Sequence, residues 1–334
     1  MTDGVVFGSV VFARHRVAAA VLTGLALVGH GLLPELPPDG ELVLLVVAVA
    51  LLGVPHGAVD HLVAKPFFAG RWQRVWLPVF GLCYVGLAAL VVLLWLLAPG
   101  VSLAGFLLLS ILHFGAGDQR DGLGALASGS LVVLGPVAVH PADCATLFAP
   151  LAGRSGDAMA GLLEGLQPLL LATVALALLP FVVRSLRRRC WAILAELGLL
   201  ATTVALLPPL QAFVLYFCIW HAPRHVLEIA QSFAPGSTRL GLRRFVWAAL
   251  PFSALTIAGG ALAWASVASL RSPSDATLQV IFIGLAALTV PHMIVMSAAS
   301  RGGDQLALSA TTAPARSRAR RAPPRPVPGC SPRP

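Results

Sequence analysis

Long apolar runs constrain this chain more than any other feature of its sequence. Of 334 residues, 57% are hydrophobic and only 11% are charged, which is outside the range of a soluble globular domain. Ten segments approach the length of about 20 residues that a helix needs to cross a bilayer. They cover 17–34, 41–61, 75–98, 101–117, 123–140, 168–184, 190–208, 210–231, 245–267 and 277–298. The sequence therefore predicts an all-α polytopic transmembrane helical bundle of about ten spans.

The positions of lysine and arginine predict the orientation of that bundle. Basic residues concentrate in cytoplasmic loops of membrane proteins. With the N-terminus inside and ten spans, all but three of the 23 lysines and arginines fall on the cytoplasmic side, the exceptions being Arg154, Arg224 and Arg271. We therefore expect both termini in the cytoplasm and a multi-pass protein of the inner (plasma) membrane. The net charge of +9 is explained by this topology, so no nucleic-acid partner is indicated.

The chain divides into two parts by composition. Residues 1–300 hold every apolar span and form one transmembrane helical domain, in which we place an intramembrane metal site. Residues 301–334 are rich in arginine and proline and lack apolar periodicity, so we expect a disordered cytoplasmic tail.

Five histidines lie within predicted spans and away from the span ends, and this is the strongest chemical signal in the sequence. They are His56, His113, His221, His225 and His292. All belong to even-numbered spans, which would run in the same direction. At about 1.5 Å per residue, the five side chains lie about 16–23 Å below the outer boundary of a core about 30 Å thick. A single such histidine is more often a hydrogen-bonded packing residue, but unrelated packing residues have no reason to share a depth, whereas ligands of one ion must.

The residues around the histidines fit such a site. His221 and His225 are four apart, so on a helix they share one face. Asp60, four residues after His56, and Glu196, at a similar depth in its span, are candidate carboxylates behind the ligands. Trp220 adjoins His221 and is a candidate pocket residue.

Ligand type alone does not choose among iron, copper, zinc and nickel. The chain has no G-x-S-x-G, P-loop or H-E-x-x-H motif, so hydrolase, nucleotide-binding and zincin functions have no support. The depth of the histidines indicates a lipid-soluble substrate that enters sideways. A carrier of b-type haem or of a metal ion, without oxygenase activity, is the alternative, as is an accessory protein with a degenerate site.

Four separated motifs resemble those of the bacterial Brp/Blh family of β-carotene 15,15′-dioxygenases. They are Gly53-Val-Pro-His-Gly-Ala-Val-Asp-His61, His113-Phe-Gly-Ala-Gly-Asp118, Trp220-His-Ala-Pro-Arg-His225 and Pro291-His-Met293. The resemblance spans the second through the tenth predicted span in order. It implies a membrane oxygenase that uses non-haem Fe(II) and O₂ to cut β-carotene at its central double bond into two molecules of retinal.

The resemblance also implies roles for particular residues. The family's proposed iron ligands fall on His56, His113, His221 and His225. His292 matches a motif position that we assign to the shell behind the ligands or to the substrate pocket. A retinal-binding opsin is the expected acceptor of the product. A relative that cuts a different carotenoid would keep the same motifs, so the resemblance is more specific for the reaction than for the substrate.

Overall fold

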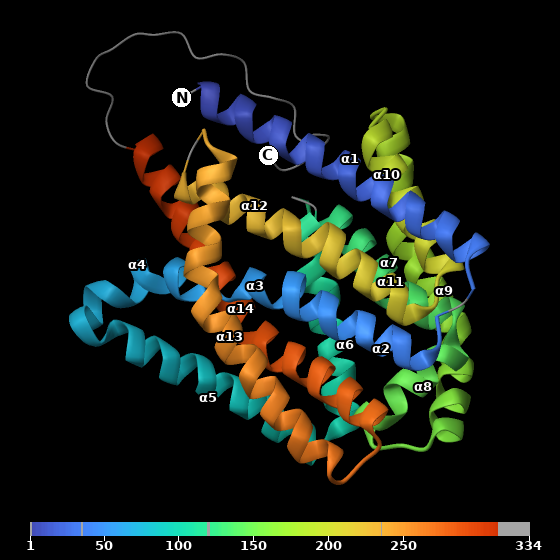
Figure 1. Cartoon of the computed structure of the whole chain (residues 1–334). Helices are drawn as coiled ribbons and strands as arrows, with labels where there is room; N and C mark the ends of the chain where they lie inside the picture. Colours follow the sequence, from blue (N-terminus) through green and yellow to red (C-terminus); the bar gives the residue numbers. More distant parts are fainter. Residues whose placement is uncertain (1, 35, 119–120, 235, 313–334) are drawn as a thin grey trace.

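The computed structural model describes residues 2–34, 36–118, 121–234 and 236–312, and every regular element within these ranges is a helix (Figure 1). The α-helices are α1 (Thr2–Leu32), α2 (Pro38–Ala48), α3 (Val54–Gly57), α4 (Asp60–Trp72), α5 (Trp76–Leu97), α6 (Pro99–Asp118), α7 (Gly122–Val139), α8 (Pro141–Ala152), α9 (Gly156–Arg187), α10 (Trp191–Leu206), α11 (Pro209–Leu215), α12 (Ala222–Phe233), α13 (Thr238–Ala268) and α14 (Pro273–Thr312). Two π-helical segments, η1 (Val49–Gly53) and η3 (Tyr216–His221), and one 3₁₀ turn, η2 (Gln73–Val75), link some of them. The predicted all-α class is confirmed.

Seven helical stretches in the described chain are long and apolar enough to cross a membrane. They are Val10–Leu32, Pro38–Leu97, Pro99–Ala116, Gly122–Val139, Gly156–Arg187, Thr238–Ala268 and Pro273–Ala299. Large apolar side chains on them face outward, among them Leu82 and Leu262, as expected of helices that contact lipid. These stretches support a membrane protein, while the count of ten spans is not confirmed.

The difference in count has a structural reason. The predicted spans 41–61 and 75–98 fall within one helical stretch, Pro38–Leu97, that turns at Gln73, where φ is 43°. The predicted span 190–208 is the shorter helix α10, with 16 residues. The predicted span 210–231 is divided among α11, η3 and α12. By length and hydropathy, the first two of these four predicted spans are therefore counted as one, and the last two are not counted.

Both π-helical segments precede a proline, and the proline explains them. Pro55 follows η1 and Pro223 follows η3, each at the start of the next helix. A proline has no N–H to offer the carbonyl four residues back, and its ring collides with that carbonyl, so the preceding turn widens. For Pro223 that carbonyl belongs to Ile219, and the ring of His15 on α1 donates to it instead, at 3.1 Å.

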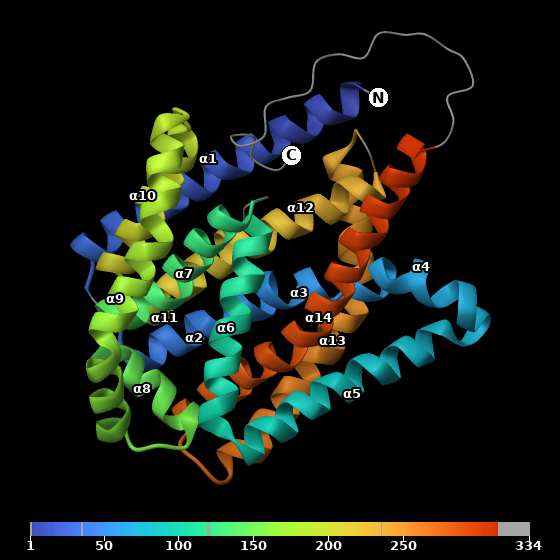
Figure 2. The same ribbon diagram turned by 180° about the vertical axis from the view of Figure 1, so that it is seen from behind.

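The two proline-interrupted helices lie side by side and run in the same direction (Figures 1 and 2). α2 contacts α11, η1 contacts η3, and α3 contacts α12. At the crossing, a Cβ on Gly53 would lie 2.6 Å from Cε1 of Phe217, so a larger residue at this position would require the Phe217 ring to move. The contact brings the histidines that follow the two segments to one level.

The contact between α6 and α7 is built differently. A Cβ on Gly115 would collide with the carbonyl oxygen of Ala125, and one on Gly129 would collide with that of Ile111. The two backbones therefore touch directly, as small residues permit in membrane helices. α7 is also the most deeply buried span candidate, with 56% of its apolar window buried inside the bundle.

Two further segments were assigned from the sequence. The connection between the predicted spans 123–140 and 168–184 contains α8 and the first turns of α9. α14 continues to Thr312, past Ser300 where the tail was expected to begin, and the remainder of the expected tail, 313–334, lies outside the described residues.

Candidate metal centre

Five imidazole rings from four parts of the chain meet in the interior of the bundle. His56 lies on α3, His113 on α6, His221 at the end of η3, His225 on α12 and His292 on α14. The ring centroid of His56 is 5.8 Å from those of His221 and His225 and 5.4 Å from that of His292. The His113 centroid is 4.8 Å from that of His221 and 5.3 Å from that of His292. The structure thus brings together all five histidines that the sequence placed at a common depth.

The hydrogen bonds of these rings leave nitrogen lone pairs for another partner. The Nδ1–H of His56 donates to the carbonyl of Gly53, and that of His292 donates to Asp60, so in both rings Nε2 carries the free lone pair. Nε2 of His225 is buried and has no hydrogen-bond partner in the described part of the chain. A buried polar atom without a partner costs about 1–3 kcal/mol, which a bound cation would recover.

The spacing of the nitrogens fits one metal ion. One ligand atom each of His56, His113 and His292 lie within 4.8 Å of one another. The Nε2 atoms of His113 and His221 are 3.1 Å apart. Two imidazole nitrogens bound at about 2.1 Å to one ion, at right angles, are about 3.0 Å apart. An all-imidazole set suits a transition metal rather than calcium or magnesium, which prefer oxygen ligands.

A carboxylate and a phenol stand behind His292. Asp60 is 2% exposed, and its oxygens lie 2.8 Å and 3.0 Å from Nδ1 of His292. The hydroxyl of Tyr84 on α5 donates to the same carboxylate at 2.9 Å. Carboxylates behind a ligating histidine fix its tautomer and orientation. Asp60 therefore binds the ring of His292 and not that of the neighbouring His56.

Tyr84 was missed by the sequence analysis. It is one of two tyrosines in the chain and lies in an apolar helix, so its hydroxyl needed a partner at membrane depth. That unusual hydroxyl was the available signal, but nothing in the sequence linked it to Asp60, 24 residues earlier.

Glu196 and Trp220 occupy different surroundings. The Glu196 carboxylate pairs with Arg224 at 2.9 Å and with Arg16 of α1 at 2.9 Å, which places a charge cluster beside the helix that carries His225. Trp220 is 1% exposed, and its indole N–H donates to Thr23 of α1 at 2.9 Å.

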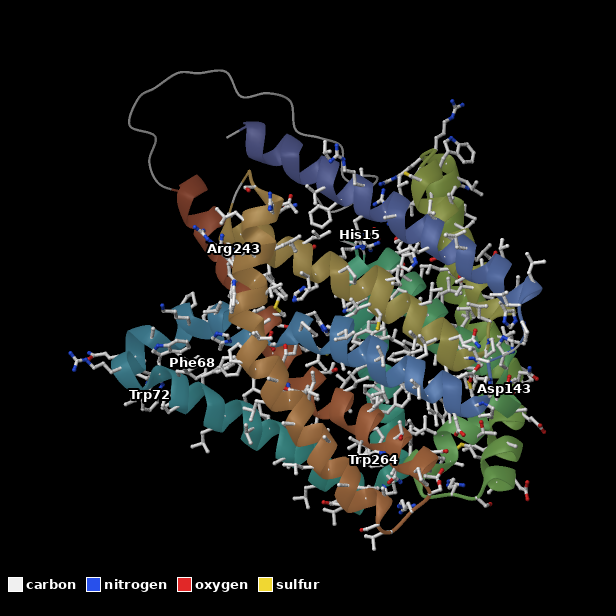
Figure 3. All side chains as sticks on the ribbon, in the orientation of Figure 1. His15, Phe68, Trp72, Asp143, Arg243 and Trp264 are labelled. Atoms are coloured by element: carbon white, nitrogen blue, oxygen red, sulfur yellow. The ribbon has the colours of Figure 1, made fainter. Side chains whose placement is uncertain are left out.

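Neither Glu196 nor Trp220 is among the described residues that line the cavity below. Figure 3 labels His15 between α1 and α12. Together with Glu196 and Trp220, His15 connects α1 to the segment that carries His221.

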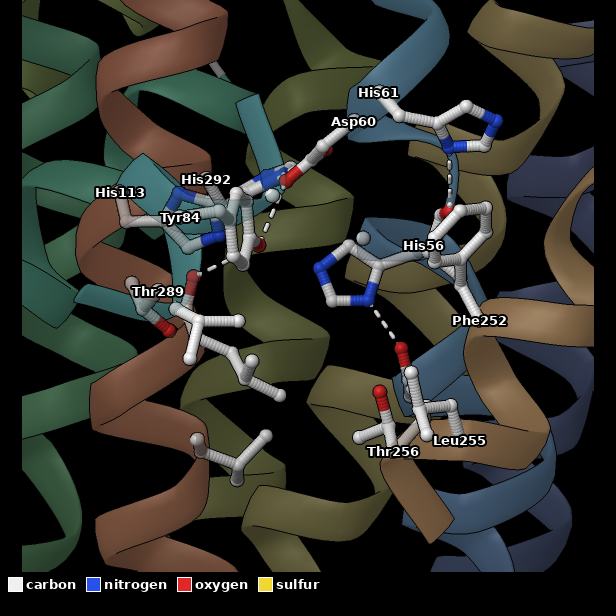
Figure 4. Close-up of a pocket in the computed structure, with 18 of the residues that line it drawn as sticks. His56, Asp60, His61, Tyr84, His113, Phe252, Leu255, Thr256, Thr289 and His292 are labelled. Atoms are coloured by element: carbon white, nitrogen blue, oxygen red, sulfur yellow. Dashed lines mark hydrogen bonds and ion pairs between the residues drawn. The ribbon is translucent and has the colours of Figure 1, made fainter. Parts of the chain in front are cut away.

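A cavity of about 560 Å³ adjoins the histidines (Figure 4). Its lining includes the polar side chains of His56, His113, His292, Asp60 and Tyr84. Aromatic and aliphatic side chains form most of the remaining wall, with contributions from α5, α6, α11, α13 and α14, including Phe80, Phe106, Phe213, Phe252 and Leu285. Cavities of this size and character hold elongated apolar ligands with a few polar groups at the reacting end.

A bundle of span-length helices with buried imidazoles beside an apolar cavity defines a class of helical membrane protein that could hold a metal ion next to an apolar ligand. Comparison with known proteins identifies the family within this class. The model of the β-carotene 15,15′-dioxygenase family matches residues 47–299. The chain therefore belongs to this family, and the recognition made from the four histidine motifs is confirmed.

Two relatives show how far the similarity extends. The chain is 27% identical over 296 residues to a probable β-carotene 15,15′-dioxygenase Blh of Halobacterium salinarum, covering 79% of this chain and 85% of that protein. It is 29% identical over 257 residues to the β-carotene 15,15′-dioxygenase of an uncultured marine bacterium, 66A03, covering 74% of this chain and 90% of that one. No solved structure matches the chain.

Proposed function

We propose that this chain cleaves the central double bond of β-carotene with O₂ to give two molecules of retinal. The observation that carries the proposal is the position of the imidazole cluster beside an apolar cavity, in a chain that belongs to the β-carotene 15,15′-dioxygenase family. Both relatives named above carry that activity in their names.

The metal in this proposal is non-haem Fe(II), with His56, His113, His221 and His225 as its ligands. The geometry favours adding His292, since its Nδ1 is occupied by Asp60 and its ring adjoins those of His56, His113 and His225. When bound, iron supplies the activation of O₂, which no side chain of the cluster can supply by itself.

The other residues of the site orient the His292 ring and exclude water. Asp60 and Tyr84 hold the His292 ring in one orientation. Phe114 and Phe217 pack their rings against that of His221, at centroid distances of 4.8 Å and 6.0 Å, and both line the cavity. These rings keep water from the site and position an apolar polyene against the imidazoles.

The topology belongs to the same proposal. We place the protein in the plasma membrane with ten membrane crossings and both termini in the cytoplasm. The distribution of lysine and arginine supports this arrangement. The parallel course of α2–α3 and α11–α12 is consistent with it, because both lie in spans assigned the same direction. A retinal-binding opsin in the same membrane is the proposed acceptor of the product.

The test replaces histidines singly and measures two quantities. His56→Ala, His113→Ala, His221→Ala and His225→Ala should each reduce retinal formation in carotene-producing cells to background and lower the iron content of the purified protein. His30→Ala is the matched control, because His30 lies on α1 outside the cluster, and it should change neither. Wild-type retinal yield from two of the four variants would contradict the ligand assignment. The wild-type protein could bind iron and cleave a hydroxylated carotenoid, yet form no retinal from β-carotene. That result would support the metal site and contradict the proposed substrate.

A further inference from the structure

The exposed part of the cavity wall comes from only two helices. Among the residues that line the cavity, those classed as exposed are Leu77, Pro78 and Val85 on α5 and Leu255 on α13. Leu77, Val85 and Leu255 expose 38%, 66% and 69% of their surface. The lining residues from the other helices are buried or half-buried. A wall residue that is also on the outer surface marks the edge of an opening, so the cavity opens between α5 and α13.

The surface around this opening is apolar and belongs to two span candidates. α5 is the apolar end of the stretch Pro38–Leu97, and α13 is the stretch Thr238–Ala268. Leu82, Leu96 and Leu262 on these helices are more than 70% exposed. Such exposure is unfavourable in water but not in lipid. The opening therefore faces the hydrocarbon of the bilayer.

We propose that this opening is a lateral portal through which an elongated apolar polyene passes from the bilayer to the metal centre. We define the portal by Leu77, Gly81 and Val85 on α5 and Leu255 on α13. The inference rests on the proposed function for its substrate, and it adds the route by which that substrate arrives. The expected occupant is uncharged along its length, because the portal presents no charged side chain.

The α5 side of the portal has a gap at its centre. Leu77, Gly81 and Val85 are spaced four residues apart, so they form one stripe along the helix. Gly81 lines the cavity, and a Cβ built on it would meet nothing within 4 Å. The absence of a side chain at this position leaves the middle of the stripe open, where a leucine would otherwise narrow the passage.

The portal leads directly to the metal centre. Tyr84, next to Val85 on α5, donates to Asp60, and Asp60 accepts from His292. On the opposite wall, Phe252 and Thr256 flank Leu255 and also line the cavity (Figure 4). The portal residues and the imidazoles of His56, His113 and His292 therefore line one continuous cavity.

The experiment measures entry separately from chemistry. Full-length iron-loaded protein in lipid nanodiscs is mixed with β-carotene without O₂, and the rate of binding is followed by quenching of tryptophan fluorescence. Retinal formation is then measured with O₂. Gly81→Phe and Leu255→Trp should each slow binding and retinal formation at least ten-fold, with iron content and thermal stability unchanged.

Each variant has a matched control on its own helix. Gly86→Phe places the same ring on α5 at a glycine that also has nothing within 4 Å but does not line the cavity. Leu262→Trp places the same indole on α13, two turns beyond Leu255 on the same face, at a position 72% exposed. Both controls should bind β-carotene at the wild-type rate.

Three outcomes would overturn the portal: wild-type binding rates in Gly81→Phe and Leu255→Trp, an equal slowing in the two controls, or a loss of iron from the portal variants. If wild-type protein binds β-carotene at a rate that the portal variants reduce, yet forms no retinal, the proposed function fails while the portal stands. The two ideas therefore fail separately.

Discussion

Two helix contacts in this bundle bring backbones close together by opposite means. Between α6 and α7, regular helices meet through glycines, and the carbonyl oxygens of Ala125 and Ile111 occupy the space of the missing side chains. Between η1 and η3, prolines widen both helices, and the ring of Phe217 occupies the space left by Gly53. The first contact includes one candidate metal ligand, His113, which lies on α6 between Ile111 and Gly115. The second leads into candidate ligands on both segments, with His56 after η1 and His221 and His225 at and after the end of η3.

The two contacts differ in what their helix geometry provides. Regular helices with small residues gain from direct backbone contact, which is a source of stability available in lipid, where no hydrophobic effect drives helices together. A π-helical segment is a poorer helix but turns the following side chains to a new direction. The widened segments therefore aim His56 and His221 inward, and the rest of the bundle has to hold them in place.

The largest expected effect comes from the α6–α7 contact. Gly129→Ala would force a Cβ against the backbone of Ile111, and backbone cannot yield as a flexible side chain can. We expect destabilisation at or above the upper end of the about 1–3 kcal/mol typical of overpacking, seen as loss of folded protein after detergent extraction. Gly105→Ala on α6 is the control, because its Cβ meets nothing within 4 Å.

Gly129→Ala also distinguishes the effect of the α6–α7 contact from that of the histidine cluster. Iron content and folded yield should fall together in this variant, whereas a histidine variant should lose iron and keep its fold. A stable Gly129→Ala protein with wild-type activity would show that the α6–α7 contact does not support the bundle.

The next effect concerns the residues behind the metal ligands. Asp60→Ala removes the acceptor of the His292 N–H while leaving Tyr84 a second acceptor, the Leu288 carbonyl at 3.3 Å. Loss of such an orienting carboxylate lowers metal affinity about 10–100-fold. Competition against a chelator measures the affinity, and Asp60→Asn should give a smaller loss because its amide oxygen still accepts. Wild-type iron affinity with a lower melting temperature would make Asp60 a packing residue only.

The histidine cluster was predictable because depth in a membrane can be counted along a helix. His56, His113 and His292 are far apart in the sequence, yet counting from the span ends placed them at one level. The partner of Asp60 was not predictable in this way. A spacing of four suggested His56, but the chain leaves the helix after Gly57 and begins a new one at Asp60, so the spacing rule does not apply.

The same limit explains Arg224. Glu228 lies four residues further along α12, the spacing of an ion pair along one helix, but the Arg224 guanidinium binds Glu196 on α10. Helix α12 starts immediately after a π-helical segment and packs near α1 and α10. The buried carboxylate is that of Glu196 on α10, and no pattern along α12 predicts its position. In this bundle, distances along one regular helix were predictable, and contacts between helices were not.

A smaller effect is expected where α1 fastens η3. Thr23→Val keeps the shape of the side chain but leaves the buried indole N–H of Trp220 without its 2.9 Å acceptor. An unpaired buried donor costs about 1–3 kcal/mol. We expect a lower melting temperature in detergent with unchanged iron stoichiometry, since Trp220 points away from the cavity toward α1. A loss of iron that exceeds the loss of folded protein would instead place Trp220 among the residues that hold the centre.

The smallest effect lies at the start of α7, outside the span candidates. Burial raises the pKa of Asp121, but the Gly124 N–H and the Arg184 guanidinium outweigh it and hold that pKa below its usual range. A lowered carboxylate pKa stabilises the fold above the unfolded value of about 3.9, and this stabilisation is lost as pH falls through the folded value.

Asp121→Asn preserves a helix cap and removes the ion pair, so at neutral pH it should cost at most about 1 kcal/mol, because the pair is partly exposed. Thermal unfolding of the two proteins compared from pH 7 downward checks the sign. The difference in melting temperature should shrink only below about pH 4, and a difference that grows on acidification would rule out the ion pair as its cause.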